Sequence, residues 1–155
     1  VLRATGAGVW YQDAQLAGRS CALRCASLRL DPRHAAMPNI LAIDTATECC
    51  SVALLTKDSL IDRSIMDPQG HSRLVLEMIE AVLQEGQIDP SDLDVLSYDS
   101  GPGSFTGIRI GAGVAQGLAL GLGKPLFGIS SLMILAQGVV AELAPDQSVL
   151  AAIDA

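Results

Sequence analysis

The stretch from Gly107 to Gly121 has the length of a helix but contains more glycine than a free helix tolerates. Each glycine in a helix interior costs about 1 kcal/mol relative to alanine. Because the chain accepts that cost five times, we predict that something approaches the backbone of this helix closely. The five residues are Gly107, Gly111, Gly113, Gly117 and Gly121.

Three of these glycines lie on one face of the predicted helix. Gly113, Gly117 and Gly121 recur at a spacing of four residues, and a stripe of small side chains allows two helices to cross at short distance. Two interpretations remain open, namely packing inside the molecule and contact with a partner protein. The helix is our candidate for a protein interface.

The loop GPGSFTG (101–107) precedes this helix and has the glycine content of a phosphate-binding loop. It lacks the Gly-Lys-Ser/Thr ending of a Walker motif, and Thr106 stands where a dinucleotide-binding loop has its third glycine. Gly101 and Gly103 suit backbone with positive φ, and Ser104 or Thr106 can cap a helix. The pattern favours a structural turn, whose free amides could still hold an anion.

Asp44, Thr45 and Thr47 follow an apolar strand and form a second candidate for phosphate chemistry. In actin-type phosphotransferases an aspartate at this place positions a metal ion, and hydroxyl groups approach the phosphate. The alternative is that these side chains bind the amides of a tight turn. Both interpretations stay open at this point.

The order of apolar runs and turn residues predicts an α/β fold with the order β-β-β-α-β-α-β-α. Three antiparallel strands followed by alternating helices and strands are typical of a ribonuclease-H-like, actin-like ATPase lobe. For the first helix we expect Ser72 as N-cap and Gly86 just after its end. The predicted strands are 40–46, 50–56, 60–66, 94–98 and 125–129, and the predicted helices are 71–85, 107–121 and 131–143.

The two ends of the chain differ from this middle part. Residues 1–36 hold five arginines against two acidic residues, whereas residues 37–155 hold five basic against fifteen acidic residues. We predict that 1–36 is a non-native or disordered leader without function and that 37–148 forms the first actin-like lobe. VLAAIDA (149–155) repeats the pattern of ILAIDTA (40–46), which predicts the first strand of a truncated second lobe.

Composition excludes several classes of function. The net charge of −7 argues against a protein that binds nucleic acid by itself. We expect a cytoplasmic chain without a membrane span, since no run of about 18 residues is uninterruptedly apolar. Four cysteines fit no metal-binding spacing, and two histidines, His34 and His71, are too few for a two-histidine metal site or a catalytic triad within the lobe.

Four stretches together resemble the TsaB (YeaZ) family of bacteria, and the resemblance runs from Met37 to Ala155. GPGSFTG followed by R-I-G is its most specific part. The stretches are ILAIDTATECCSVALL, GHSRLVLEMIEAVL, YDSGPGSFTGIRIGAGVAQGLALGLGKPLFGISSLMILAQG and VLAAIDA.

The resemblance implies a non-catalytic subunit, without a cofactor, of the complex that makes threonylcarbamoyladenosine at the tRNA adenosine 3′ of the anticodon. Its partners would be the catalytic paralogue TsaD, as a heterodimer, and the ATPase TsaE; alone it would form a homodimer, and tRNA would be reached only through the complex. The implied interface comprises Leu74, Val75, Met78, Ile79, Val82, Ile108, Gly111, Ala112, Ala115 and Leu118, with Gly113 and Gly117 from the glycine stripe.

The sequence departs from TsaD where TsaD-like proteins carry two metal-binding histidines. Ser131 and Leu135 occupy those positions, and a hydroxyl and an alkyl group cannot replace two imidazoles. We therefore expect no catalytic residue and no metal site. An actin-type ATP-binding phosphotransferase stays as the alternative, and a metalloprotease is less favoured.

Overall fold

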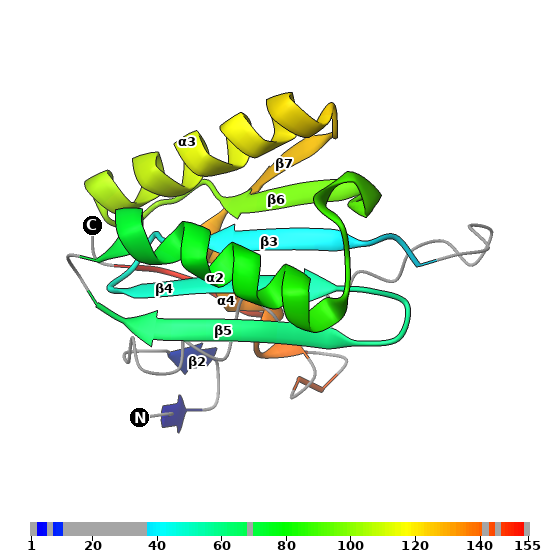
Figure 1. Ribbon diagram of the computed structural model, residues 1–155. Helices are drawn as coiled ribbons and strands as arrows, with labels where there is room; N and C mark the ends of the chain where they lie inside the picture. Colours follow the sequence, from blue (N-terminus) through cyan, green and yellow to red (C-terminus); the bar gives the residue numbers. More distant parts are fainter. Residues whose placement is uncertain are drawn as a thin grey trace.

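The computed structural model describes residues 3–5, 8–10, 37–67, 70–140, 143–144 and 147–153. Its main feature is a five-stranded mixed sheet in the order β5-β4-β3-β6-β7 (Figure 1). Helices α2 and α3 lie side by side on one face of the sheet, and α4 lies on the other. This arrangement confirms the predicted α/β class and the order of its elements.

The strands and helices lie close to their predicted ranges. A separate antiparallel pair of short strands, β1 (Arg3–Thr5) and β2 (Gly8–Trp10), precedes them. The elements of the main body are β3 (Ile40–Asp44), β4 (Cys49–Leu55), β5 (Leu60–Met66), α2 (His71–Gly86), the 3-10 helix η2 (Pro90–Asp92), β6 (Val95–Asp99), α3 (Phe105–Leu122), β7 (Leu126–Ile129) and α4 (Ser131–Gln137).

Strand β3 is central and buried along its whole length. It pairs antiparallel with β4 and parallel with β6, with Ile43 opposite Val52 on one side and Tyr98 on the other. A strand that is covered on both faces needs a continuous apolar run, which the sequence ILAI supplies. The parallel pairs require crossovers, and α2 and α3 provide them on the same face.

The main core lies between the sheet and the two crossover helices. Leu41 and Ile43 of β3 face α2 and α3, while Ala42 between them faces the opposite side of the sheet. From the helices, α2 contributes large fully buried side chains, whereas the fully buried side chains of α3 are alanines and its larger residues Ile110, Val114, Leu118 and Leu122 are only partly buried. The helical core residues are Val75, Met78, Ile79, Val82 and Leu83 of α2 with Ala115 and Ala119 of α3.

Some predicted details are wrong. Ser72 does not cap α2, because the helix already begins at His71 after Gly70 and has no side-chain cap. Gly86 is its last residue, and the left-handed conformation falls on Gln87 with φ of 54°. Helix α4 ends at Gln137, six residues earlier than predicted, where Gly138 follows.

The predictions for the two ends of the chain have different outcomes. Residues 147–153 form no strand and take part in neither described sheet. The predicted strand 149–155 is therefore not seen in its described part. Apart from β1 and β2, the predicted leader 1–36 lies outside the described residues, so its role stays a prediction.

In the part of the chain that the structure describes, α3 has the length and mean hydropathy that could cross a membrane. This is weak evidence, because helices that pack on a sheet pass the same test. Here Gly107, Gly111, Ala115 and Ala119 are buried at a spacing of four residues, so one face of α3 is packed on the sheet.

The position of the core can be tested with Leu41→Ala. Leu41 is fully buried, so its truncation leaves a cavity and should lower the free energy of unfolding by about 2–5 kcal/mol in urea denaturation. Leu150→Ala, at an exposed leucine, is the matched control and should change it by less than about 0.5 kcal/mol. Equal effects of the two substitutions would contradict the described core.

Candidate functional site

The tip of the β3–β4 hairpin lies against the start of α3. Thr45 Oγ1 donates a hydrogen bond to the carbonyl oxygen of Gly107 at 2.7 Å. The amide of Ser104 donates to the carbonyl oxygen of Ala46, also at 2.7 Å. Two segments that are about 60 residues apart in the sequence are thereby fixed together.

Three glycines make this contact sterically feasible. A Cβ atom on Gly103 would collide with the carbonyl oxygen of Ala46, and one on Gly107 would collide with that of Thr45. A Cβ atom on Gly111 would lie 2.5 Å from Thr45 Oγ1. The predicted close approach to the α3 backbone is confirmed for Gly107 and Gly111, and the approaching group is the hairpin of the same chain.

The loop before α3 is a capped turn. Ser104 is the N-cap of α3, and its hydroxyl accepts a hydrogen bond from the amide of Gly107 at 3.3 Å. Gly101 has φ of 92°, as predicted. Gly103 does not have a positive φ, and glycine is needed there because a Cβ atom would collide with the carbonyl oxygen of Ala46. Thr106 is exposed in the first turn and does not cap the helix.

The predicted phosphate-binding side chains serve the turns instead. Asp44 accepts a hydrogen bond from the amide of Ala46 at 3.0 Å, and the Thr47 hydroxyl accepts one from the amide of Cys49 at 3.2 Å. Thr45 and Ala46 also lie directly against the backbone at the start of α3. The geometry therefore fits a structural role for both motifs.

A buried carboxylate links the loop to α4. Asp99, at the end of β6, accepts hydrogen bonds from the amide of Gly101 at 2.8 Å and from Ser131 Oγ at 2.6 Å. The amide of Ser131 donates in turn to the carbonyl oxygen of Gly101 at 3.0 Å. Burial raises the pKa of Asp99, and its two hydrogen bonds oppose the rise. Sequence reasoning missed Asp99, although a lone acidic residue at the end of an apolar strand was its signal.

The adjacent thiols of Cys49 and Cys50 are free and buried. Desolvation raises the pKa of Cys50 to about 11, with further contributions from Cys49 and Asp44. The pKa of Cys49 is also raised, first by desolvation and then by Asp44. Both groups are therefore protonated at neutral pH, which makes them poor nucleophiles. Cys21 and Cys25 lie outside the described residues.

Half of the predicted interface residues are buried, because their side chains or backbone are packed within the lobe. An amphipathic helix has one apolar face, and in α2 that face is used by the core. The buried members are Val75, Met78, Ile79, Val82, Gly111 and Ala115. The remaining members, Leu74, Ile108, Ala112, Gly113, Gly117 and Leu118, are partly or fully exposed.

The outward side of α2 and α3, which we call the outer face, is open and partly apolar. A Cβ atom on Gly113, Gly117 or Gly121 would have no neighbour within 4 Å. Leu76 of α2 is 54% exposed and Leu120 of α3 is 86% exposed, which is unusual for leucine. Sequence reasoning missed both leucines, because they lie off the main apolar stripes.

A groove of about 620 Å³ runs between the C-terminal halves of α2 and α3. Apolar side chains form most of its lining, including Leu76, Leu118 and Leu122. Glu80 and Asp89 line it as well and give it an acidic character. Such a groove has the shape and chemistry to receive apolar side chains of a partner.

The described residues hold no group of three or more histidine, cysteine, aspartate or glutamate side chains that could bind a metal ion. His71 is buried at the start of α2, and its Nε2 lies 3.3 Å from the carbonyl oxygen of Glu48. Its contact joins α2 to the hairpin, which is a structural role.

Comparison with known proteins places these features in a family. Residues 67–155, more than half of the chain, match the family model described as "TsaD: tRNA N6-adenosine threonylcarbamoyltransferase". The chain is 47% identical to the tRNA threonylcarbamoyladenosine biosynthesis protein TsaB of Escherichia coli and 43% identical to that of Haemophilus influenzae, in each case over 75% of this chain. These alignments cover 50% and 49% of the two relatives, so the chain spans about half their length.

A solved structure agrees with the sequence match. YeaZ from Pseudomonas aeruginosa superposes with a TM-score of 0.66 at 42% identity, over 68% of this chain and 50% of that one. The chain is therefore similar to this family in the fold of the described lobe as well as in sequence.

Alanine substitutions can distinguish the closely packed glycines of α3 from the open ones by their effect on stability. Gly107→Ala should lower the free energy of unfolding by about 1–3 kcal/mol, because its methyl group would displace Thr45. Gly117→Ala should raise it by up to about 1 kcal/mol, because the site is open and alanine favours the helix. Urea denaturation of dilute protein measures both, and a loss of stability in Gly117→Ala would show that this face is packed within the chain.

The buried carboxylate of Asp99 should make stability depend on pH. Because its pKa is raised above the ordinary 3.8, the folded chain binds this proton more tightly than the unfolded chain does. The contribution of Asp99 to the free energy of unfolding should therefore fall as the pH rises from about 3.8 through the raised pKa. Asp99→Asn keeps an acceptor oxygen and should remove this slope from stability curves measured between pH 3 and 8; an unchanged slope would refute the assignment.

Proposed function

The chain belongs to the TsaD family, in its TsaB (YeaZ) branch, and we propose that it is a subunit for threonylcarbamoyladenosine synthesis on tRNA. In this proposal it binds and supports the catalytic paralogue TsaD. The modified base is the adenosine 3′ of the anticodon.

The observation that carries the proposal is the outer face of α2 and α3. It combines open glycines, exposed leucines and an apolar groove, and these features favour close contact with another protein. Leu76 lines the groove with Leu118, and Leu120 is exposed three residues after Gly117, so these four residues take the place of the buried members of the predicted interface. TsaD would place apolar side chains over these four residues.

A supporting rather than catalytic role agrees with the chemistry at the strand ends. The Ser131 hydroxyl is bonded to Asp99, and Thr45 lies against the start of α3. No group at these positions is poised as a nucleophile or a base, since each polar side chain is engaged in a turn or a link between elements. The same contacts disfavour an actin-type ATPase, because the amides of Gly101 and Ser104 and the hydroxyl of Thr45 have partners within the lobe.

Contact with tRNA would then depend on the partners. Residues 37–155 carry ten more acidic than basic groups, and such a surface repels phosphate. We place tRNA on TsaD, with TsaE as the ATPase of the same complex, in the cytoplasm.

The proposed contact with TsaD can be tested with Gly117→Leu. A leucine at this open position would block the close approach of a partner helix, so co-purification with the TsaD of the same organism should fall at least tenfold. Lys57→Leu, at an exposed residue of the β4–β5 turn, is the control and should bind normally. Circular dichroism should show both variants folded.

Retained binding of folded Gly117→Leu would overturn the proposed contact.

Calorimetry with ATP and Mg²⁺ tests the alternative function, an actin-type ATPase. Micromolar binding followed by turnover would overturn the proposed non-catalytic role.

A further inference from the structure

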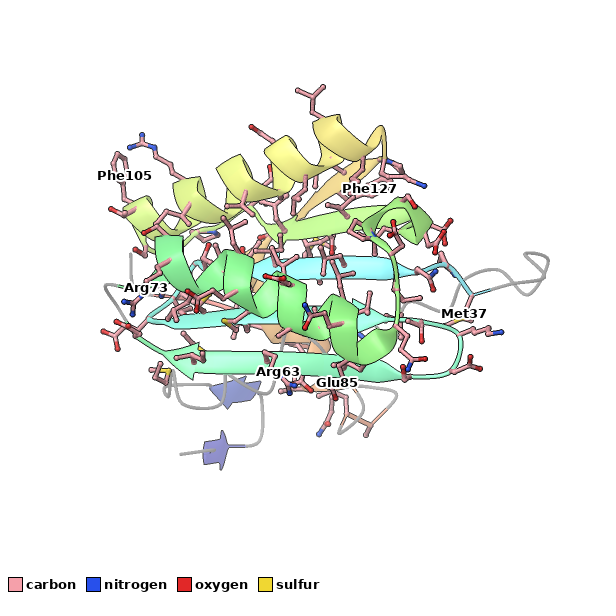
Figure 2. All side chains as sticks on the ribbon, in the orientation of Figure 1. Met37, Arg63, Arg73, Glu85, Phe105 and Phe127 are labelled. Carbon is pink, nitrogen blue, oxygen red and sulfur yellow. The ribbon has the colours of Figure 1, made fainter. Side chains whose placement is uncertain are left out.

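Phe105 and Arg109 lie on the side of α3 that faces away from the β3–β4 hairpin. Gly107, between them in the sequence, packs against the carbonyl oxygen of Thr45. A step of two residues along a helix turns by about 200°, so both side chains point to the opposite side. Figure 2 shows Phe105 projecting from the start of α3, where it is 70% exposed. The tight contact at Gly107 therefore places an aromatic and a basic side chain on the outer face.

These two side chains form a cation–π pair. The guanidinium carbon of Arg109 lies 3.4 Å from the ring centroid of Phe105. The ring covers one face of the planar guanidinium and orients it, while the N–H groups at its edge stay available. Two parallel N–H groups of an arginine match the two oxygens of a carboxylate. The pair is thus preorganised to bind an oxyanion beside an apolar surface.

The positive charge of Arg109 is not used for an ion pair in the described part of the chain. Lys57 and Arg63 each form an ion pair with an acidic side chain. Arg73 and Arg109 are both exposed, and among the described residues neither has such a partner. Arg73 lies in the first turn of α2, at the same end of the helix pair as Phe105 (Figure 2). This end of the outer face therefore offers two guanidinium groups to a partner.

The cation–π pair continues into the open glycines of α3. Phe105, Arg109, Gly113 and Gly117 recur at a spacing of four residues and form one slanted row on the helix. A Cβ atom on Gly113 or Gly117 would have no neighbour within 4 Å. A partner helix that lies along this row meets the charged pair first and the open backbone one and two turns later.

We propose that the Phe105–Arg109 pair is the polar anchor of the contact with TsaD and binds the carboxylate of an aspartate or glutamate on the surface of TsaD. The inference rests on the function proposed above, which supplies the partner and the face but not the chemistry of the contact. The ring of Phe105 would pack against the apolar atoms beside that carboxylate. Because apolar stripes and open glycines fit a partner in several positions, the polar anchor would set its register along α3.

The surroundings favour a single carboxylate over a polyanion such as RNA. Glu48 and Asp67 lie near the start of α2, and Glu77 follows one turn after Arg73. Residues 37–155 together carry ten more acidic than basic groups. Such a field repels a chain of phosphates. One carboxylate meets less repulsion, and it gains a bidentate contact with the guanidinium.

Substitutions of Arg109 separate the polar anchor from a general attraction between charges. In isothermal titration calorimetry with the TsaD of the same organism, Arg109→Glu should weaken binding about tenfold or more. Arg109→Lys keeps the charge but loses the planar fork, so it should recover only part of the affinity. Lys57→Glu makes the same change of charge in the exposed β4–β5 turn and should bind normally.

A double-mutant cycle tests whether the two side chains act as one unit. Phe105→Leu keeps an apolar side chain but removes the ring on which the guanidinium stacks. Phe105→Leu and Arg109→Lys disrupt the same stacked pair, so the loss of affinity in the double variant should be smaller than the sum of the two single losses. Additive losses would refute the role of the stacked pair.

The outcomes distinguish this inference from the proposed function. Unchanged binding of TsaD by folded Arg109→Glu, together with loss of binding by Gly117→Leu, would overturn the inference and leave the proposed function standing. No binding of TsaD by the unmodified chain would overturn both. Retention of an anticodon stem-loop RNA by the unmodified chain and its loss in Arg109→Glu, with TsaD binding unchanged, would assign the pair to RNA and overturn the inference.

Discussion

The close contact between Thr45 and the first turns of α3 determines how the lobe is arranged. The carbonyl oxygen and hydroxyl of Thr45 occupy the space that Cβ atoms of Gly107 and Gly111 would need. This contact sets the distance between the end of β3 and the axis of α3. Once that distance is small, the row of α3 that lies directly on the sheet has room only for small side chains, and Ala115 and Ala119 continue it, while larger residues of α3 pack at its edges. The outer face is therefore positioned by a contact on the opposite side of the same helix.

The glycine content of α3 predicted a close approach, but the sequence could not assign each glycine to a neighbour. Gly107 and Gly111 belong to one row with a spacing of four, and Gly113 and Gly117 belong to another. Two residues along a helix correspond to a rotation of about 200°, so the rows lie on opposite sides. Spacing separates the rows, and only tertiary structure shows that the first faces the hairpin and the second faces open space.

The apolar stripe of α2 was predicted correctly as a feature, but in the fold its residues belong to the core. An amphipathic helix has the same pattern whether its apolar face meets a sheet or a partner, because burial removes the same surface from water in both cases. In the fold the sheet covers Val75 and Val82, which leaves Leu76 beside the stripe as the accessible apolar residue. The order of strands and helices was more predictable, since the apolar runs and turn residues agree along most of the lobe.

The two sides of α3 have different roles. One side packs against the β3–β4 hairpin, and the other side, on the outer face, is open to a partner protein. On the hairpin side, the hydrogen bonds of Thr45 and Ser104 tie the loop and the start of α3 to the β3–β4 hairpin, so glycine there serves contact within the chain. On the other side of α3 no such contact exists, so glycine there lowers helix stability without a compensating interaction inside the described lobe. A compensating interaction with a second protein would account for that residue choice.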